Sequence, residues 1–156
     1  MTIDPRTRIG HVHLTVSDLD SALQFYRDVL GFEVTARYGA DAVFLSAGGY
    51  HHHIGLNTWA GRGAPHPAPK TTGLYHFAIL FADRAALAAA VRRVLEHRIP
   101  LEGASDHGVS EAIYLRDPDG NGIELYRDRP ENEWPRGPEG GIRMLTRPLD
   151  LQALLA

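Results

Sequence analysis

The amino-acid sequence predicts an α+β fold built from two tandem βαβββ modules. Three observations predict it: alternating strands that are each followed by a helical pattern, three short strands after each helix, and a Gly- and Pro-rich segment between the halves. The halves share this order of elements although their sequences are dissimilar. Because each half is small for a unit that folds alone, we expect the two modules to form one domain.

The first module begins with a strand over residues 9–16, where His11 and His13 alternate with apolar neighbours. Ser17 can cap the helix that follows, and apolar residues recur on one helical face until Gly31, where a helix stop is expected. Short strands separated by Gly-containing turns complete the module, and we expect them over residues 32–38, 42–47 and 51–59.

The second module repeats that order. An apolar strand over residues 74–81 precedes a helix that Asp83 can open, with apolar side chains on one face. A turn over residues 117–122, with the sequence Asp-Pro-Asp-Gly-Asn-Gly, joins the last two strands. The three strands after the helix are expected over residues 99–103, 111–115 and 123–126.

Changes in composition give the expected boundaries. The segment between the modules is rich in Gly and Pro, and the C-terminal part is polar and Pro-rich before an apolar stretch over residues 149–155. That stretch predicts one or two helical turns, which could pack on the chain itself or on a partner. The boundaries are a domain over 8–128, with module one at 8–59, a linker at 60–72 and module two at 73–128, followed by a tail at 129–156.

Composition excludes several classes of function. The formal net charge of -3 gives no electrostatic basis for nucleic-acid binding. No apolar stretch approaches the roughly 18 residues of a membrane span, and the N-terminal residues lack the apolar core of a signal peptide. The chain has no Cys, so it can form no disulfide or thiolate metal site, and a cytoplasmic location fits. The sequence is instead notable for 9 His, the commonest protein metal ligand.

Two of the His residues and one Glu predict a metal site. His11 lies at the start of the first module and His76 at the matching place in the second, while Glu124 lies in the final strand. Two His and one carboxylate can occupy one face of an octahedral ion and leave other positions open. This donor set suits non-haem Fe(II) and also holds Mn(II). We therefore expect one divalent ion, with Fe(II) preferred.

The sequence motifs resemble those of the vicinal oxygen chelate superfamily, which includes glyoxalase I, extradiol dioxygenases and antibiotic-resistance proteins. The resemblance implies that the two modules form one curled mixed sheet around a metal cleft. It also implies that His11, His76 and Glu124 are the ligands, although His13 shares the strand parity of His11 and could replace it. The segments that carry the resemblance are residues 10–18, 25–32 and 117–125.

The chain departs from glyoxalase I at one position. That enzyme has a fourth ligand, a Glu, in the last strand of its first module, and the matching residue here is Gly55. A Gly supplies no ligand. This departure favours a three-ligand site over the four-ligand isomerase site.

Further residues resemble the catalytic residues of extradiol dioxygenases. The run of three His before Gly55 resembles the segment that supplies a base beside the metal, and it leaves His52 and His53 as alternatives. Tyr114, ten residues before Glu124, matches a Tyr whose hydroxyl contacts a metal-bound substrate oxygen. His107, in the loop before that strand, matches a His that lines the pocket.

The resemblance is closest to the catechol 2,3-dioxygenase-like members. It implies an Fe(II)-dependent enzyme that opens a catechol-type aromatic diol with dioxygen and takes part in aromatic catabolism. It also implies a homodimer, because members of the superfamily are often dimers. The alternatives are another metal enzyme of the same fold, such as a glyoxalase-like lyase, an isomerase or an antibiotic-modifying transferase, or a non-catalytic protein that binds an aromatic ligand.

Overall fold

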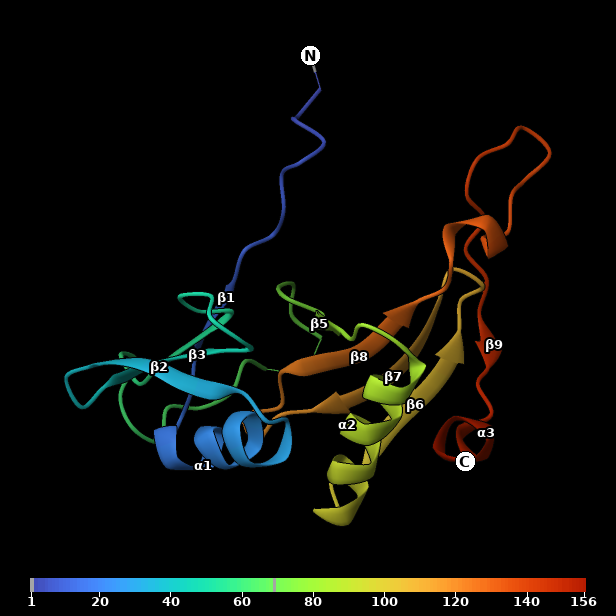
Figure 1. Cartoon of the computed structure of the whole chain (residues 1–156). Coiled ribbons are helices and arrows are strands. Elements are labelled where there is room, and N and C mark those ends of the chain that lie inside the picture. The colour runs from blue at the N-terminus through green and yellow to red at the C-terminus, as the bar shows by residue number, and fades with distance from the viewer. Residues whose placement is uncertain (1, 69) are drawn as a thin grey trace. The chain divides into compact units, whose positions relative to one another are not determined.

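The computed structural model describes residues 2–68 and 70–156 and divides into two compact units, Met1–Pro65 and His66–Ala156. The α+β class and the order strand–helix–three strands, repeated once in each unit, are confirmed (Figure 1). The strands form two mixed sheets, one in each unit, where the resemblance implied one curled sheet. The expected linker includes Pro69, which lies outside the described residues. A single domain over residues 8–128 stays a prediction.

The first unit is a four-stranded sheet with one helical segment. Its strand order is β1-β4-β3-β2, in which β1 and β4 are parallel and the other neighbours antiparallel. The helix continues as a π-helical segment, η1, and ends before Gly31, whose φ of 89° is the left-handed conformation expected of a helix stop. The elements are β1 (Val12–Thr15), α1 (Leu19–Leu23), η1 (Gln24–Val29), β2 (Glu33–Tyr38), β3 (Ala42–Ser46) and β4 (Ile54–Asn57).

Three details of this unit differ from the sequence-based expectation. Asp18, not Ser17, caps α1, because its carboxylate accepts a hydrogen bond of 2.8 Å from the Ser21 amide. His11 lies directly before β1 and not inside it. The run of residues 51–53 also precedes its strand, since it belongs to the connection between β3 and β4.

The second unit is a five-stranded sheet in the order β5-β8-β7-β6-β9, with β5 and β8 parallel. Asp83 caps the long helix as predicted, accepting a 2.8 Å hydrogen bond from the Ala86 amide. His76, like His11, lies directly before its strand. The elements are β5 (Phe77–Leu80), α2 (Arg84–Glu96), β6 (Leu101–Asp106), β7 (Ser110–Arg116), β8 (Gly122–Asp128), η2 (Glu131–Glu133), β9 (Arg147–Pro148) and α3 (Leu151–Leu155).

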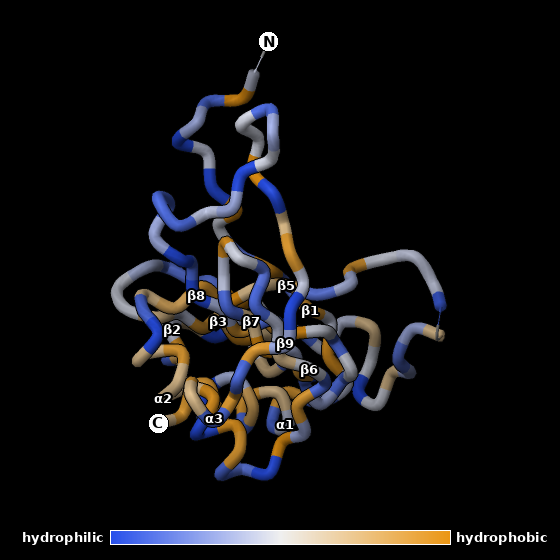
Figure 2. Tube along the Cα trace, turned by 90° about the vertical axis from the view of Figure 1, so that its right-hand side faces the viewer, coloured by the Kyte–Doolittle hydropathy of each residue, from blue (hydrophilic) through white to orange (hydrophobic). Residues whose placement is uncertain are grey.

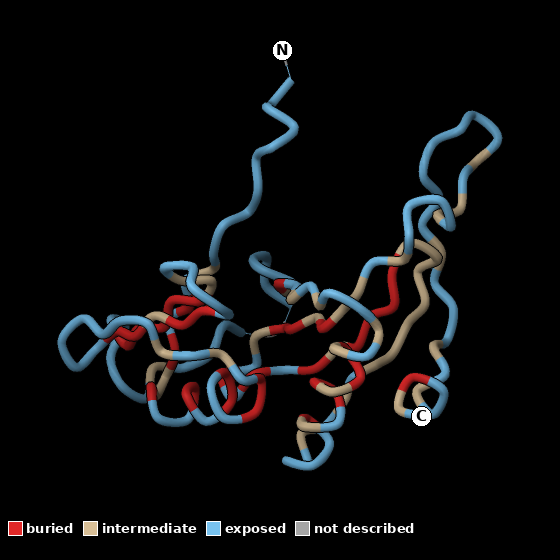
Figure 3. Tube along the Cα trace, viewed as in Figure 1, coloured by how far each residue is buried: buried red, intermediate tan, exposed pale blue. Residues whose placement is uncertain are grey.

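The central strands of this sheet present different chemistry on their two faces. Tyr114 pairs with Glu124, whereas the neighbouring positions pair Ile113 with Leu125 and Leu115 with Ile123. Successive side chains of a strand point to opposite faces, so the Ile and Leu residues form the buried core (Figure 3). That core includes the apolar face of α2, which contacts β8. Tyr114 and Glu124 are thereby directed to the other face, away from the helix.

The C-terminal tail packs on its own unit. Leu154 of α3 is buried, and α3 lies against α2 (Figure 2). Arg84 and Arg92 of α2 donate hydrogen bonds of 2.9 and 2.7 Å to the carbonyls of Ala153 and Leu155 near the end of α3. These cationic side chains satisfy carbonyls that a short helix leaves unpaired. No helix in the described part of the chain is long and apolar enough to cross a membrane.

Candidate metal and substrate site

His76 and Glu124 meet where β5 begins beside β8. The Nε2 atom of His76 lies 2.9 Å from Oε2 of Glu124, and both side chains are partly buried. Gly122 makes this approach possible, because a Cβ atom at this position would collide with the Tyr75 carbonyl oxygen and lie 3.0 Å from Cβ of His76. The last Gly of the predicted turn therefore also brings two strands together closely at the site.

The geometry of this pair fits a shared metal ion. Adjacent octahedral ligands at about 2.1 Å from a metal stand about 3.0 Å apart, close to the separation of His76 Nε2 and Glu124 Oε2. Nδ1 of His76 is buried without a hydrogen-bond partner. Across residues 2–68 and 70–156, no three His, Asp or Glu side chains converge into a metal site within either unit. The pair supplies two of the three predicted donors, and His11 belongs to the first unit.

Tyr114 lies beside this pair. It faces Glu124 in the antiparallel register of β7 and β8, and its hydroxyl oxygen lies 3.2 Å from Oε1 of Glu124. Partial burial, followed by the negative charge of Glu124 and the contact with its carboxylate, raises the pKa of Tyr114 to about 12. The phenol therefore keeps its proton at neutral pH and can act as a donor. The interval of ten residues noted in the sequence corresponds to directly paired strand positions.

His107 completes a chain of polar groups. It lies in the turn between β6 and β7, and its Nε2 atom is 2.7 Å from the Tyr114 hydroxyl. Its Nδ1 atom is 2.7 Å from the Leu145 carbonyl oxygen in the tail. Short polar contacts thus connect His107 to Tyr114, Tyr114 to Glu124, and Glu124 to His76. All four residues named for this unit from the sequence lie together.

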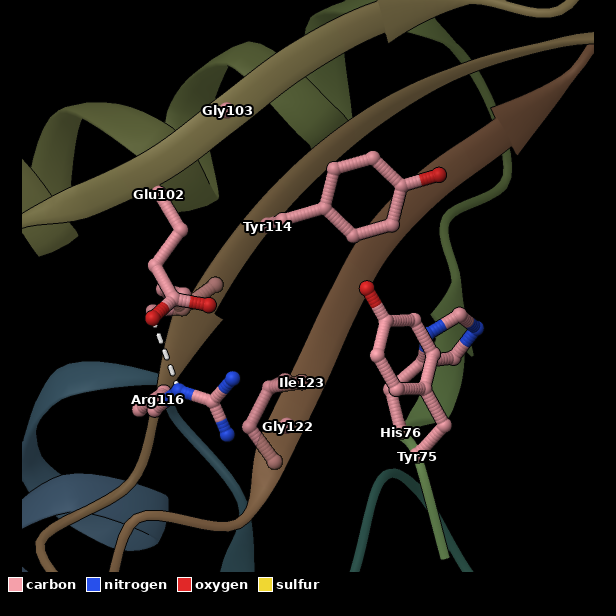
Figure 4. A pocket seen from close by; sticks show the side chains of 9 residues that line it. Tyr75, His76, Glu102, Gly103, Tyr114, Arg116, Gly122 and Ile123 are labelled. Atoms are coloured by element: carbon pink, nitrogen blue, oxygen red, sulfur yellow. Dashed lines mark hydrogen bonds and ion pairs between the residues drawn. The ribbon is translucent and has the colours of Figure 1, made fainter. Parts of the chain in front are cut away.

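A hollow of about 230 Å³ opens beside these groups. Figure 4 shows Tyr75, His76 and Tyr114 gathered near one part of it, while the Glu102–Arg116 ion pair, at 2.7 Å, lies in another part. Aromatic rings with a few polar groups are typical of small-molecule sites. The hollow is lined by Tyr75, His76, Glu102, Gly103, Tyr114, Leu115, Arg116, Gly122 and Ile123.

The first unit shows why no ligand can extend from Gly55. His13 faces Gly55 across β1 and β4, and a Cβ atom at Gly55 would lie 2.9 Å from Cγ of His13. In the second unit the equivalent register pairs Ala78 with Glu124. In the second unit the larger side chain of the pair, Glu124, is on the last strand. In the first unit the larger side chain, His13, is on the first strand. The His13 ring thus covers the place where a side chain of residue 55 would begin.

The three His before β4 have different surroundings. The His52 ring centroid lies 4.3 Å from that of His11, and Nδ1 of His52 lies 2.7 Å from Nδ1 of His51. Burial and the neighbouring His11 lower the pKa of His52. His53 instead pairs its Nδ1 with Oγ of Ser46 at 3.1 Å, inside the connection from β3. Of the two alternatives left by the sequence, His52 is therefore the one beside the proposed ligand.

The sequence alone does not predict the roles of three residues in this region. Tyr75 carries no signal beyond its position before His76, and its ring stands 5.2 Å from the His76 ring. The sequence predicts only a turn at Gly122. Leu145 contributes a backbone carbonyl, which no residue type encodes, so only the folded tail reveals its contact with His107.

Comparison with known proteins places this architecture in a family. The model of the glyoxalase/bleomycin resistance protein/dioxygenase superfamily matches residues 8–125. The chain therefore belongs to this superfamily, as the sequence motifs predicted.

Individual relatives include enzymes with different reactions. The chain is 44% identical to a catechol-2,3-dioxygenase of Bacillus subtilis, over 99% of this chain and 53% of that protein. It is 36% identical to biphenyl-2,3-diol 1,2-dioxygenase 3 of Rhodococcus globerulus, over 82% of this chain and 66% of that protein. A crystal structure of lactoylglutathione lyase from Agrobacterium tumefaciens is similar at a TM-score of 0.60 and 29% identity, covering 80% of this chain and 96% of that one. The chain thus spans about half the length of the first relative.

Proposed function

We propose that this chain provides the catalytic site of an Fe(II)-dependent extradiol dioxygenase that opens a catechol-type diol. The observation that carries the proposal is the connected group of His107, Tyr114, Glu124 and His76 on one face of the second sheet. A metal-binding pair beside a protonated phenol is suited to a substrate that must bind a metal through its oxygens and be oriented by a hydrogen bond. Similarity to two proteins described as dioxygenases supports the same reaction class.

In this proposal His11, His76 and Glu124 hold the ion. Bound Fe(II) would lower the pKa of the diol hydroxyls and leave positions open for substrate and dioxygen. Mn(II) is the alternative ion for this donor set. The overall reaction adds both atoms of dioxygen and breaks the ring bond next to the diol carbons.

The side chains around the ion would then orient the substrate and move its protons. The Tyr114 oxygen would accept a hydrogen bond from one diol hydroxyl, while Nε2 of His107 would accept the Tyr114 proton and hold the hydroxyl in place. His52, beside His11, would accept a proton from the diol. Its lowered pKa supports this role, because a neutral imidazole can act as a base at neutral pH.

A lyase acting on a thiol adduct is the second candidate, and the similarity to lactoylglutathione lyase favours it. The contact between His13 and Gly55 speaks against it, since it leaves no side chain at the position of the fourth ligand in glyoxalase I. A non-catalytic protein that binds an aromatic ligand would retain that binding without metal and in a Glu124→Ala protein.

The test is oxygen uptake by protein loaded anaerobically with Fe(II), then mixed with air and a panel of catechols. We expect oxygen consumption matched by an absorbing ring-opened product. Glu124→Gln should abolish both signals, whereas Glu96→Gln, an exposed carboxylate at the end of α2, should retain them. Conversion of a hemithioacetal without oxygen uptake would favour the lyase. Full activity of the Glu124→Gln protein would contradict the proposed site.

A further inference from the structure

The polar chain through Tyr114 ends on the C-terminal tail, beyond the residues that match the superfamily model. His107 and Leu145 exchange two hydrogen bonds. The amide of Leu145 donates to the carbonyl of His107 at 3.0 Å, and the ring Nδ1 of His107 is 2.7 Å from the Leu145 carbonyl. The tail therefore contacts both the backbone and the ring of this residue.

Neighbouring contacts hold Leu145 in this position. Gly108, at a φ of 77°, faces the tail so closely that a Cβ atom would lie 2.7 Å from Cγ of Pro135 and 3.1 Å from Cδ1 of Leu145. The amide of Arg143 donates to the Pro135 carbonyl at 2.8 Å. After Leu145 the chain joins the sheet through β9, where Pro148 lies opposite Ser105 of β6. Leu145 is thus anchored on both sides.

These contacts define which ring nitrogen of His107 carries a proton. A carbonyl oxygen can only accept, so Nδ1 must be the donor in this hydrogen bond. In a neutral ring the Nε2 atom is then without a proton and accepts from the Tyr114 hydroxyl, 2.7 Å away. Without the Leu145 carbonyl, the other tautomer would place a proton on Nε2. Nε2 would then donate to the Tyr114 oxygen instead of accepting from it.

We propose that Leu145 is a positioning residue: its carbonyl fixes the Nδ1–H tautomer of His107 and so keeps Nε2 as the acceptor for Tyr114. The tail is then part of the site and not only a cover for the sheet edge. The effect on turnover rests on the proposed function, whereas the tautomer does not. Groups that orient a functional imidazole typically change activity by about 10- to 100-fold.

The first experiment reads the tautomer directly. Full-length protein with ¹⁵N-labelled His is studied by long-range ¹H–¹⁵N correlation at a pH where the imidazole is neutral, and His107→Gln assigns the signal. We expect a protonated Nδ1 and an unprotonated Nε2. A protonated Nε2, or an equal mixture of both tautomers, would overturn the inference.

The second experiment weakens the Leu145 carbonyl as a hydrogen-bond acceptor. Replacing the Leu145–Thr146 amide by an ester reduces the basicity of the Leu145 carbonyl and keeps every side chain. The matched control is an ester at the Arg143–Met144 linkage, whose N–H and carbonyl make no hydrogen bond within residues 2–68 and 70–156. We expect the Leu145 ester to increase the Nε2–H tautomer and to lower kcat roughly tenfold at nearly constant KM.

The two hypotheses fail in different ways. If no catechol is cleaved by the unaltered protein, the proposed function fails, and the tautomer measurements still decide the inference. If catechols are cleaved but the Leu145 ester matches the control ester in tautomer and in kcat, the inference about Leu145 is wrong while the dioxygenase assignment stands.

Discussion

At the residue scale, Tyr114 links His107 to Glu124 in the site of the second unit. One hydroxyl lies between the Nε2 of His107 at 2.7 Å and the Oε1 of Glu124 at 3.2 Å. Removing the oxygen separates His107 from Glu124 and leaves the ring packing intact. This makes Tyr114 the most selective position at which to test the proposed reaction.

Tyr114→Phe should therefore lower kcat for catechol cleavage by roughly 100-fold, because the hydroxyl that hydrogen-bonds the substrate is lost. Metal content should stay the same, since Phe removes no ligand. Steady-state kinetics and metal analysis on the same preparation provide the check. Tyr38→Phe, which changes an exposed side chain on β2, is the control. Equal kcat in the two variants would refute the role of Tyr114.

A second residue-scale contact concerns Gly55. Gly55→Ala should lower the free energy of unfolding by about 1–3 kcal/mol, because the new Cβ would lie 2.9 Å from the His13 ring. Urea denaturation measures this change. The His13→Ala background should remove most of it, as expected for two residues in contact. Gly49→Ala, with open space around the added Cβ, is the control and should have little effect.

At the element scale, the β6–β7 hairpin places His107 and is held by Asp106 at the end of β6. The carboxylate accepts hydrogen bonds from the Gly108 amide at 2.8 Å and from Arg129 Nη2 at 2.9 Å. Partial burial raises the pKa of Asp106, but these two donors outweigh it and hold the pKa below its ordinary value. The ionised carboxylate therefore stabilises the hairpin.

Since the pKa is lower in the folded protein, this stabilisation is fully present above the unfolded value of about 4 and is lost as the pH falls through the folded value. Asp106→Asn should thus reduce the acid dependence of stability below about pH 4. Urea midpoints measured across that range test it. An unchanged pH dependence would contradict the account, and Glu96→Gln serves as the exposed-carboxylate control.

At the scale of the whole molecule, the proposed ligands come from both units: His11 from the first, His76 and Glu124 from the second. A ligand that binds only the folded protein stabilises it in proportion to occupancy. The homodimer expected from the superfamily stays a prediction. The tail, one candidate for a partner contact, packs instead on its own unit through Leu154.

Adding Fe(II) or Mn(II) under anaerobic conditions should raise the free energy of unfolding by about 2.7 kcal/mol at about 100 times Kd, and chelation should reverse the gain. His11→Ala and His76→Ala should each remove most of it. His97→Ala, beyond the end of α2, should not. Metal stabilisation that survives His11→Ala would show that the first unit supplies a different ligand or none, with His13 the next residue to replace.

The sequence by itself determined the order of elements and the residue types for metal chemistry, because periodicity, capping and turn residues are local signals. It placed Tyr114 and Glu124 at an interval that the strand register explains. Only the tertiary structure showed that the His52 ring lies beside His11, that His53 contacts Ser46, and that His13 covers Gly55. Only it brought the Leu145 carbonyl to His107. These contacts join segments far apart along the chain, often through backbone atoms, and no single residue type encodes them.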